Sequence, residues 1–371
     1  MYQKLFIPKN RLAAMFSLPL VLTGALGTAR VEATPPSDTG KVLVTNRTSG
    51  TLSVIDVATD MVIETVSLAV PGFRPPDPMY VSYVPKLNRI YVNDRTNSAI
   101  TMLDANSFEL LDSVPVGKGA FHMWADPNGK QLWAVNDVDK TLTVINPKTL
   151  DVLATLPIPA DLAALGGKPH DIAIDNNAKA AFVTILGTSD GKGYVLRYDT
   201  KKRVVTHRAT VGGDPHVGLG WKKPVVYVAC QTDSKVYVLS TKDLKPVHDP
   251  IAVPNAHGTG WTHKDKTFFA TNITGAGVDG LQAINTSTNI VVGKTNTGEG
   301  SEETAEDVPH NIIISGQDSK LYISHSGHDE GEFSGVVTVY DIRDPKAPKY
   351  LHTIHVGLNP FGIAYMGKKS R

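Results

Sequence analysis

One motif recurs seven times along this chain of 371 residues and constrains its architecture. Each copy has a short, β-branched strand that ends in Asn or another polar residue, then a polar turn and a second short strand. The copies cover residues 42–56, 90–104, 132–146, 181–199, 226–240, 268–285 and 321–341. Self-similarity at a spacing of this size is typical of repeat architectures such as β-propellers.

Two more strands complete each repeat. A third strand with weaker alternation follows each copy, as at residues 61–66 and 152–156. This is expected of an outer strand that faces solvent. A further short strand precedes every copy except the first, as at residues 169–174, and the one that the first copy lacks occurs at the C-terminus, as residues 360–365.

These observations predict an all-β fold, a seven-bladed β-propeller of four-stranded blades, closed by pairing of the N-terminal strands with the C-terminal strand. Closure removes the exposed sheet edge. The start of the innermost strand recurs about every 47 residues, as a four-stranded blade requires. Because a β-sandwich would not repeat one motif with complementary ends, we expect residues 34–371 to form a single domain.

The repeats resemble those of a known family, the exported bacterial seven-bladed propellers with Tyr-Val-Thr-Asn (YVTN-type) repeats. The first copy carries the likeness, in Val44-Thr45-Asn46 and in the run from Ser49 to Asp56. The likeness covers residues 41–366. It implies the propeller fold but no single activity, because members include surface proteins, lactonase-like enzymes, binding proteins and relatives of propeller oxidoreductases.

Residues 1–33 have the features of a secretory signal peptide. Basic residues precede an apolar run at residues 12–26, and a site with small residues at the cleavage positions ends at Ala33. The apolar run is interrupted and short for a membrane anchor. We therefore predict cleavage after Ala33 and a periplasmic or secreted mature protein.

Composition narrows the class of partner. The 37 basic and 36 acidic residues give a formal net charge of +1, which predicts no general attraction to nucleic acid or anionic lipid. No later segment is long and apolar enough to predict a membrane span after signal cleavage. The single cysteine, Cys230, excludes an intramolecular disulfide and c-type haem attachment.

Histidines recur at the start of the innermost strands. The position is marked in the seven repeats by Met79, His122, His170, His216, His257, His310 and Phe361. Equivalent positions in a propeller surround one axis, so five imidazoles are expected at one mouth of the central channel. Bulky polar residues also cap such channels by bonding to a neighbouring blade, and this structural alternative stays open. The other histidines, such as His207, His248 and His263, are predicted at the surface.

Two loops of the last repeats are predicted on the same face as these histidines. One contains His325 and His328, and an acidic insertion at residues 299–307 precedes His310. Carboxylates beside imidazoles attract divalent cations and fix histidine tautomers. A solvated loop without function is the alternative.

The predicted metal ligands are His122, His170, His216, His257, His310, His325 and His328. Neutral imidazole suits zinc, copper, iron or nickel, whereas calcium and magnesium prefer oxygen ligands. We therefore expect Cu or Zn at the channel mouth, bound for delivery to a partner or as a cofactor.

Two other functions remain open. A lactonase-like or other small-molecule enzyme would use a ring histidine as general base at the same site. A non-catalytic interaction scaffold would bind an envelope protein partner or a glycan, and its histidines would be structural. Motifs for nucleotide binding or a serine nucleophile elbow are absent from the sequence.

Overall fold

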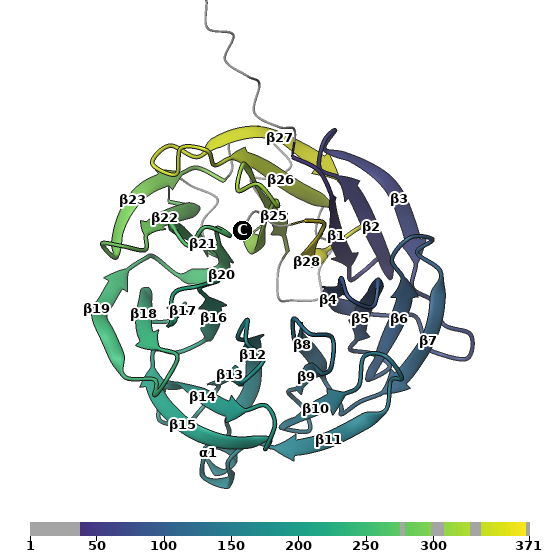
Figure 1. Ribbon diagram of the computed structural model, residues 1–371, viewed down its shortest axis with the longest axis horizontal. Helices are drawn as coiled ribbons and strands as arrows, with labels where there is room; N and C mark the ends of the chain where they lie inside the picture. Colours follow the sequence, from purple (N-terminus) through teal and green to yellow (C-terminus); the bar gives the residue numbers. More distant parts are fainter. Residues whose placement is uncertain (1–37, 275–278, 298–307, 327–334, 369–371) are drawn as a thin grey trace, which may run out of the picture. The chain divides into compact units, whose positions relative to one another are not determined.

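The first and last strands of the propeller pair with each other. In the computed structural model, which describes residues 38–274, 279–297, 308–326 and 335–368, β1 (Lys41–Asn46) pairs antiparallel with β28 (Pro360–Met366). The register places Val42 opposite Tyr365. The predicted closure of the ring is therefore confirmed (Figure 1).

The described strands form seven four-stranded antiparallel sheets, the blades, which we number in chain order. Blade 1 joins β28 and β1 to β2 (Thr51–Asp56) and β3 (Met61–Ser67). Blade 2 contains β4 (Pro78–Val84), β5 (Arg89–Asp94), β6 (Ala99–Asp104) and β7 (Leu110–Pro115). Blade 3 contains β8 (Ala120–Ala125), β9 (Leu132–Asn136), β10 (Thr141–Ile145) and β11 (Val152–Pro157).

The remaining blades follow the same order. Blade 4 contains β12 (Lys168–Ile174), β13 (Ala180–Leu186), β14 (Gly193–Asp199) and β15 (Val204–Val211). Blade 5 contains β16 (Pro215–Leu219), β17 (Val225–Cys230), β18 (Lys235–Ser240) and β19 (Pro246–Ala252). Blade 6 contains β20 (Ala256–Trp261), β21 (Thr267–Asn272), β22 (Leu281–Asn285) and β23 (Ile290–Thr295). Blade 7 contains β24 (Pro309–Ile314), β25 (Lys320–His325), β26 (Val336–Asp341) and β27 (Lys349–His355).

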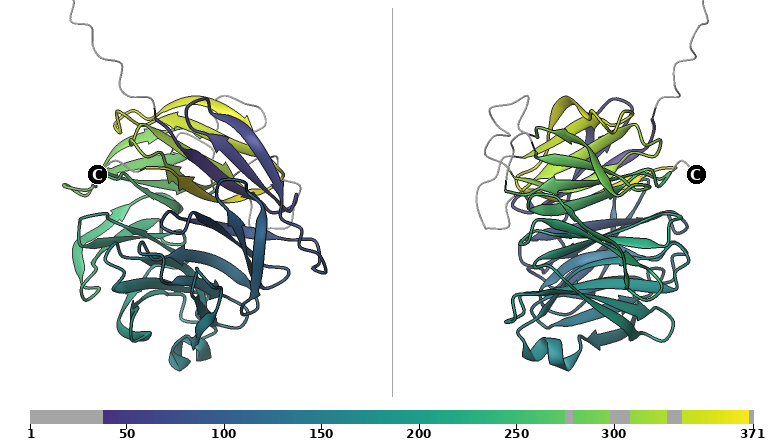
Figure 2. Two further views of the ribbon diagram at one scale, coloured as in Figure 1. Left: turned by 45° about the vertical axis from the view of Figure 1, so that its right-hand side comes forward. Right: turned by 90° about the vertical axis from the view of Figure 1, so that its left-hand side faces the viewer.

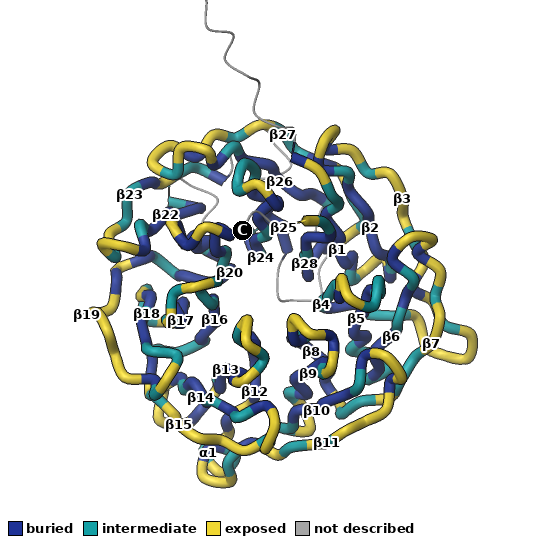
Figure 3. The backbone as a smooth tube through the Cα atoms, in the orientation of Figure 1, coloured by how far each residue is buried: buried dark blue, intermediate teal, exposed yellow. Residues whose placement is uncertain are grey.

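Burial falls from the centre of the ring to its rim. The innermost strands surround the channel, and the outermost strands form the circumference (Figure 1). Seen edge-on, the strands run across the thickness of the ring (Figure 2). Every residue of β9 is buried, whereas β15 is exposed along most of its length (Figure 3). Within the described residues, the short helix α1 (Ala160–Ala164) links blades 3 and 4, and no helix is long and apolar enough to span a membrane.

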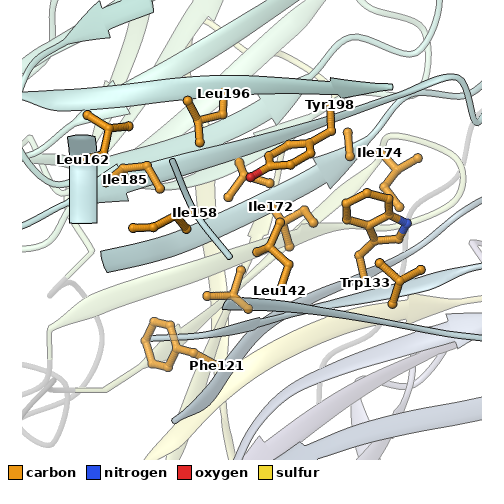
Figure 4. Close-up of a cluster of buried hydrophobic side chains, with 14 of the residues drawn as sticks. Phe121, Trp133, Leu142, Ile158, Leu162, Ile172, Ile174, Ile185, Leu196 and Tyr198 are labelled. Atoms are coloured by element: carbon orange, nitrogen blue, oxygen red, sulfur yellow. The ribbon is translucent and has the colours of Figure 1, made fainter. Parts of the chain in front are cut away.

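Apolar side chains between neighbouring blades hold the ring together. Between blades 3 and 4, Trp133 and Leu142 pack with Ile172 and Tyr198 in one buried cluster (Figure 4). Burial of each large apolar side chain of this kind contributes about 1.5–3 kcal/mol. Since each blade presents one face to each neighbour, this packing fixes the positions of the innermost strands around the axis.

A β-bulge near the start of six innermost strands determines which side chains meet at the channel. In β12, for example, Pro169 pairs with Ile185 and Ile172 pairs with Val183, so His170 and Asp171 together face one residue of the partner strand. Such a bulge bends the strand and redirects side chains. Only β16 of the seven innermost strands pairs without this shift.

Candidate metal centre

Six aromatic side chains form a closed circle in the channel, which we call the channel ring. Its members are Phe121, His170, His216, His257, His310 and Phe361. In that order the distances between adjacent ring centroids are 5.2, 4.6, 3.7, 4.8 and 4.3 Å, and 5.9 Å from Phe361 back to Phe121. Met79, the residue of blade 2 at the corresponding position, is buried in the apolar cluster beside them.

In blades 2, 3, 4 and 7 the second residue of the bulge supplies another set of contacts. Tyr80 lies against His122 with 3.8 Å between ring centroids and 31° between the ring planes, and His122 is 2.6 Å from a carboxylate oxygen of Asp171. Asn311 donates to the backbone oxygen of Phe361 at 3.0 Å. Two consecutive residues of a blade therefore reach the centre because the bulge adds one residue to the strand.

This geometry corrects one part of the sequence interpretation. His122 does not occupy the same position as His170, because Ala120 pairs with Asn136 and the bulge then contains Phe121 before His122. Phe121 is the equivalent of His170, and His122 is the equivalent of Asp171. A repeat motif gives the spacing of strands, but a bulge shifts a side chain by one residue.

The Nε2 atoms of His170 and His216 and one oxygen of Asp214 form a triangle at the centre. The two nitrogens are 3.3 Å apart, and Oδ1 of Asp214 lies 3.5 Å from the first and 3.6 Å from the second. An ion bound tetrahedrally at 2.0–2.1 Å requires ligand atoms about 3.3 Å apart. The triangle therefore has nearly the dimensions of three ligands on one ion.

Asp214 was not recognised from the sequence. It lies in the turn just before β16, with a positive φ of 50° that Asp and Asn adopt more readily than other non-glycine residues. Its carboxylate reaches the channel ring from outside the strand. The available signal was the segment Gly212-Gly213-Asp214-Pro215, directly ahead of His216.

Asp171 was also missed, although it adjoins His170 in the sequence. Its carboxylate contacts Nδ1 of His122 at 2.6 Å and accepts the backbone N–H of Val217 at 2.8 Å, so it links blades 3, 4 and 5. Burial opposes ionisation, but the neighbouring imidazole of His122 and the backbone N–H of Val217 lower the pKa of Asp171 to about 2. This carboxylate is ionised at neutral pH and orients His122.

His122 presents its other nitrogen to the cluster. Its pKa is lowered by burial, partly opposed by Asp171, and the pKa of His170 is lowered well below its ordinary value by burial and by the neighbouring His216 and His122. Both are neutral at pH 7, the form that binds metals. Among the described residues, no hydrogen-bond partner lies within reach of the buried Nε2 of His122.

Besides the triangle, two overlapping groups in the described part of the chain have the spacing to hold a metal ion. His122, His170 and His216 form one, and Asp214, His216 and His257 form the other, with the ligand atoms of each group within 4.8 Å of one another. The buried group of three histidines could therefore hold a metal ion.

The other predicted ligands that the structure describes, His310 and His325, belong to neither group. His310 is a member of the channel ring, and its Nδ1 is 2.6 Å from Nδ2 of Asn311. His325 is at the end of β25, with Nε2 2.7 Å from the hydroxyl of Thr338. His328 and the acidic insertion at residues 299–307 lie outside the described residues.

His263 differs from its prediction as a surface residue. It is buried, with Nδ1 2.7 Å from a carboxylate oxygen of Asp318. His263 follows the end of β20, whereas His257 lies near the start of the same strand. His263 and Asp318 therefore form a second buried His–Asp pair, away from the channel ring.

Two arginines beside the channel ring are each paired with a carboxylate. Arg47 lies over Phe361 and pairs with Asp77 at 2.9 Å, and Arg95 lies over Phe121 and pairs with a further aspartate, Asp137, at 3.1 Å. Each pair is neutral as a unit. The guanidinium groups therefore add little repulsion toward a cation in the centre.

The sequence matches no protein-family model and no curated protein. Solved structures share the fold at low identity. Hydrazine synthase from Kuenenia stuttgartiensis aligns with a TM-score of 0.61 and 13% identity over 81% of this chain and 96% of that chain. A functionally unknown protein from Desulfotomaculum acetoxidans aligns with a TM-score of 0.66 and 12% identity, over 89% and 100%.

A third similar structure is the dihydro-heme d1 dehydrogenase NirN in complex with DHE. It aligns with a TM-score of 0.59 and 12% identity, over 90% of this chain and 76% of that chain. At such identities the likeness shows the fold alone. The fold and the centre together define the class, a seven-bladed β-propeller with a buried histidine cluster that could hold a metal ion. Membership of the Tyr-Val-Thr-Asn family stays a prediction.

Proposed function

We propose that the protein binds one Zn²⁺ or Cu²⁺ ion at the centre of its channel, for delivery to a partner or as a cofactor. The triangle of His170, His216 and Asp214, with sides of 3.3, 3.5 and 3.6 Å, is the observation that carries this proposal. Imidazole nitrogen with one carboxylate oxygen is a ligand set that suits zinc and copper.

Two features around the triangle support the same conclusion. The carboxylates of Asp171 and Asp214 together match the charge of one divalent ion, and the neutral His122 and His170 add no positive charge beside it. A buried polar atom without a partner costs about 1–3 kcal/mol, and Nε2 of His122 is such an atom among the described residues. An ion in the centre would remove this cost.

The carboxylate of Asp171 has the role that outer-shell carboxylates have in metal sites. By accepting the Nδ1–H of His122, it fixes the tautomer that leaves Nε2 with its lone pair. Because Asp171 also accepts the N–H of Val217, its own position is fixed by the adjacent blade.

The test is a metal titration of tag-free protein stripped with a chelator. Wild-type protein is expected to bind one equivalent of Zn²⁺ or Cu²⁺, and the double variant His170→Ala/His216→Ala is expected to bind none at the centre. The matched control, His207→Ala/His248→Ala, removes two exposed histidines from outer strands and should retain binding. Wild-type protein without bound metal, or equal binding by both double variants, would contradict the proposal.

An enzyme at the same centre is the second candidate. Three protein ligands with an open fourth position are the pattern of catalytic zinc sites, and the Asp214 side chain is 30% exposed, so solvent reaches one side of the triangle. Hydrolysis of a lactone by the metal-loaded protein, lost in the His170→Ala/His216→Ala variant, would favour this function over delivery.

We also propose that the protein acts outside the cytoplasm, after cleavage at Ala33. The basic, apolar and small-residue segments of residues 1–33 support export. The mass of protein recovered from the periplasm or culture medium tests this, and a mature chain that starts at Thr34 is expected. Protein that keeps residues 1–33 and stays in the cytoplasm would contradict it.

A further inference from the structure

The two groups of possible ligands share His216, so one imidazole can serve either group. We call His122, His170 and His216 the histidine set, and Asp214, His216 and His257 the acidic set. We propose that a single ion moves between these two sets: it binds first to the acidic set and finally to the histidine set. This inference rests on the proposed function.

One ion, and not two, fits both sets together. Nε2 of His216 faces Nε2 of His170 at 3.3 Å and Oδ1 of Asp214 at 3.6 Å, so the same nitrogen serves both sets. A nitrogen lone pair binds one ion. Two divalent ions would also bring four positive charges close to the two carboxylates of Asp171 and Asp214, and like charges at short range in a buried site are unfavourable.

The distances allow the ion to exchange one ligand at a time. Oδ1 of Asp214 lies 3.5 Å from Nε2 of His170 as well as 3.6 Å from that of His216. The ion can therefore release His257 and bind His170 while Asp214 and His216 remain bound. It then releases Asp214 and binds Nε2 of His122, and at the end of each step it has three protein ligands.

Exposure indicates the direction in which an ion from solvent travels. The Asp214 side chain is 30% exposed, whereas those of His122 and His170 are 7% and 9% exposed. An approaching hydrated cation therefore meets a carboxylate first. The other ligands of both sets are buried, including His257 and His216. Nε2 of His122, which has no hydrogen-bond partner among the described residues, becomes bound only in the histidine set.

This arrangement suits a protein that takes up and releases an ion. A neutral ligand used only during transfer, such as His257, lowers the barrier to both processes and leaves the final affinity unchanged. A permanent ligand would instead contribute to affinity. The difference between a change in rate and a change in equilibrium constant makes the inference testable.

The experiment follows Co²⁺ binding by stopped-flow absorbance, with the equilibrium Kd measured by competition with a chelator. In His257→Gln, which removes a ligand of the acidic set without removing a charge, the association and dissociation rate constants are expected to fall together, while Kd stays nearly unchanged. In Asp214→Asn, the association rate constant and the affinity are both expected to fall, because the ion loses a neighbouring negative charge. His122→Gln is expected to weaken Kd by about tenfold or more.

The substitution at position 214 is mild for the fold. Asn adopts the positive φ of 50° found there as readily as Asp does. Circular dichroism checks that each variant is folded, and His207→Ala, which changes an exposed histidine, provides the control for both rates and Kd.

The outcomes separate this inference from the function on which it rests. Wild-type protein that binds no Co²⁺ overturns the proposed function itself. One bound equivalent, with both rates unchanged in His257→Gln, overturns only the movement between sets. A Kd weakened as strongly in His257→Gln as in His122→Gln makes His257 a permanent ligand and also overturns the inference, as do two bound equivalents in the wild type.

Discussion

The Nε2 atoms of His170 and His216 lie 3.3 Å apart although the two residues belong to different blades. Each residue follows the proline that begins or nearly begins its innermost strand, and the packing of blades 4 and 5 places the two strands side by side. Two imidazoles that face each other in this way either share a proton or share an ion. The position of Asp214 favours the ion, because its carboxylate oxygen completes the triangle.

Replacement of Asp171 by Asn tests the role of its charge. Asn retains an oxygen that can accept N–H groups but removes the negative charge beside His122. We expect affinity for Zn²⁺ to fall by about 10- to 100-fold, the usual effect of losing an outer-shell carboxylate. Isothermal titration with a competing chelator measures this change.

A matched control for that variant is Asp318→Asn. Asp318 forms the other buried His–Asp pair, with His263 at 2.7 Å, away from the channel ring. This substitution should leave Zn²⁺ affinity unchanged. Equal losses of affinity in the two variants would mean that Asp171 has no specific role at the centre.

Stability of the metal-free protein should depend on pH through His170. Burial, with the neighbouring His216 and His122, lowers the folded-state pKa of His170 well below its ordinary value of 6.5. Below pH 6.5 the unfolded chain binds a proton at His170, whereas the folded protein binds it only at lower pH. The contribution of neutral His170 to the free energy of unfolding is therefore fully present above pH 6.5 and is lost as pH falls.

The variant His170→Gln should therefore show a shallower loss of stability with falling pH. Urea unfolding in the presence of a chelator, at several pH values between about 5 and 7, gives the free energy of unfolding for both proteins. The exposed variant His207→Gln should follow the wild type. Identical slopes for wild type and His170→Gln would show that His170 is protonated as easily in the folded state.

Metal binding should stabilise the propeller, because the ligands come from different blades. An ion that binds only the folded state at 100 times its Kd adds about 2.7 kcal/mol to the free energy of unfolding. We expect the melting temperature to rise by several degrees on addition of Zn²⁺, as measured by calorimetry. The double variant His170→Ala/His216→Ala should show no rise; an equal rise in both would place the bound ion elsewhere.

The packing between blades can be tested at Trp133. This side chain is fully buried between blades 3 and 4, in the cluster that contains Leu142 and Ile172. Trp133→Ala is expected to cost about 3–5 kcal/mol of unfolding free energy. Trp124→Ala, at a position of β8 where the side chain is exposed, is the control and should cost far less.

The fold could be predicted because local sequence patterns define the strands and turns of each repeat. Runs such as residues 42–56 and 132–146 specify strands by β-branched residues and turns by polar ones, and the unmatched strand at residues 360–365 specifies closure. These signals depend on neighbours in the sequence. The structure confirms all seven blades and the pairing of β1 with β28.

The centre could be predicted only in outline. A bulge depends on how two strands pair, so the shift of His122 by one residue relative to His170 was not visible in the spacing of the histidines. The contact between His122 and Asp171 depends on packing between blades. Asp214 lies in a turn, where a single acidic residue gives no signal that distinguishes it from other turn residues.

The most direct test of a metal ion at the channel centre is an anomalous difference map of crystals grown with Zn²⁺ and measured at the zinc absorption edge. We predict one strong peak in the channel, within bonding distance of Nε2 of His170 and His216. A channel without a peak, in crystals whose only zinc lies at exposed histidines such as His207 or His248, would contradict the proposed metal centre.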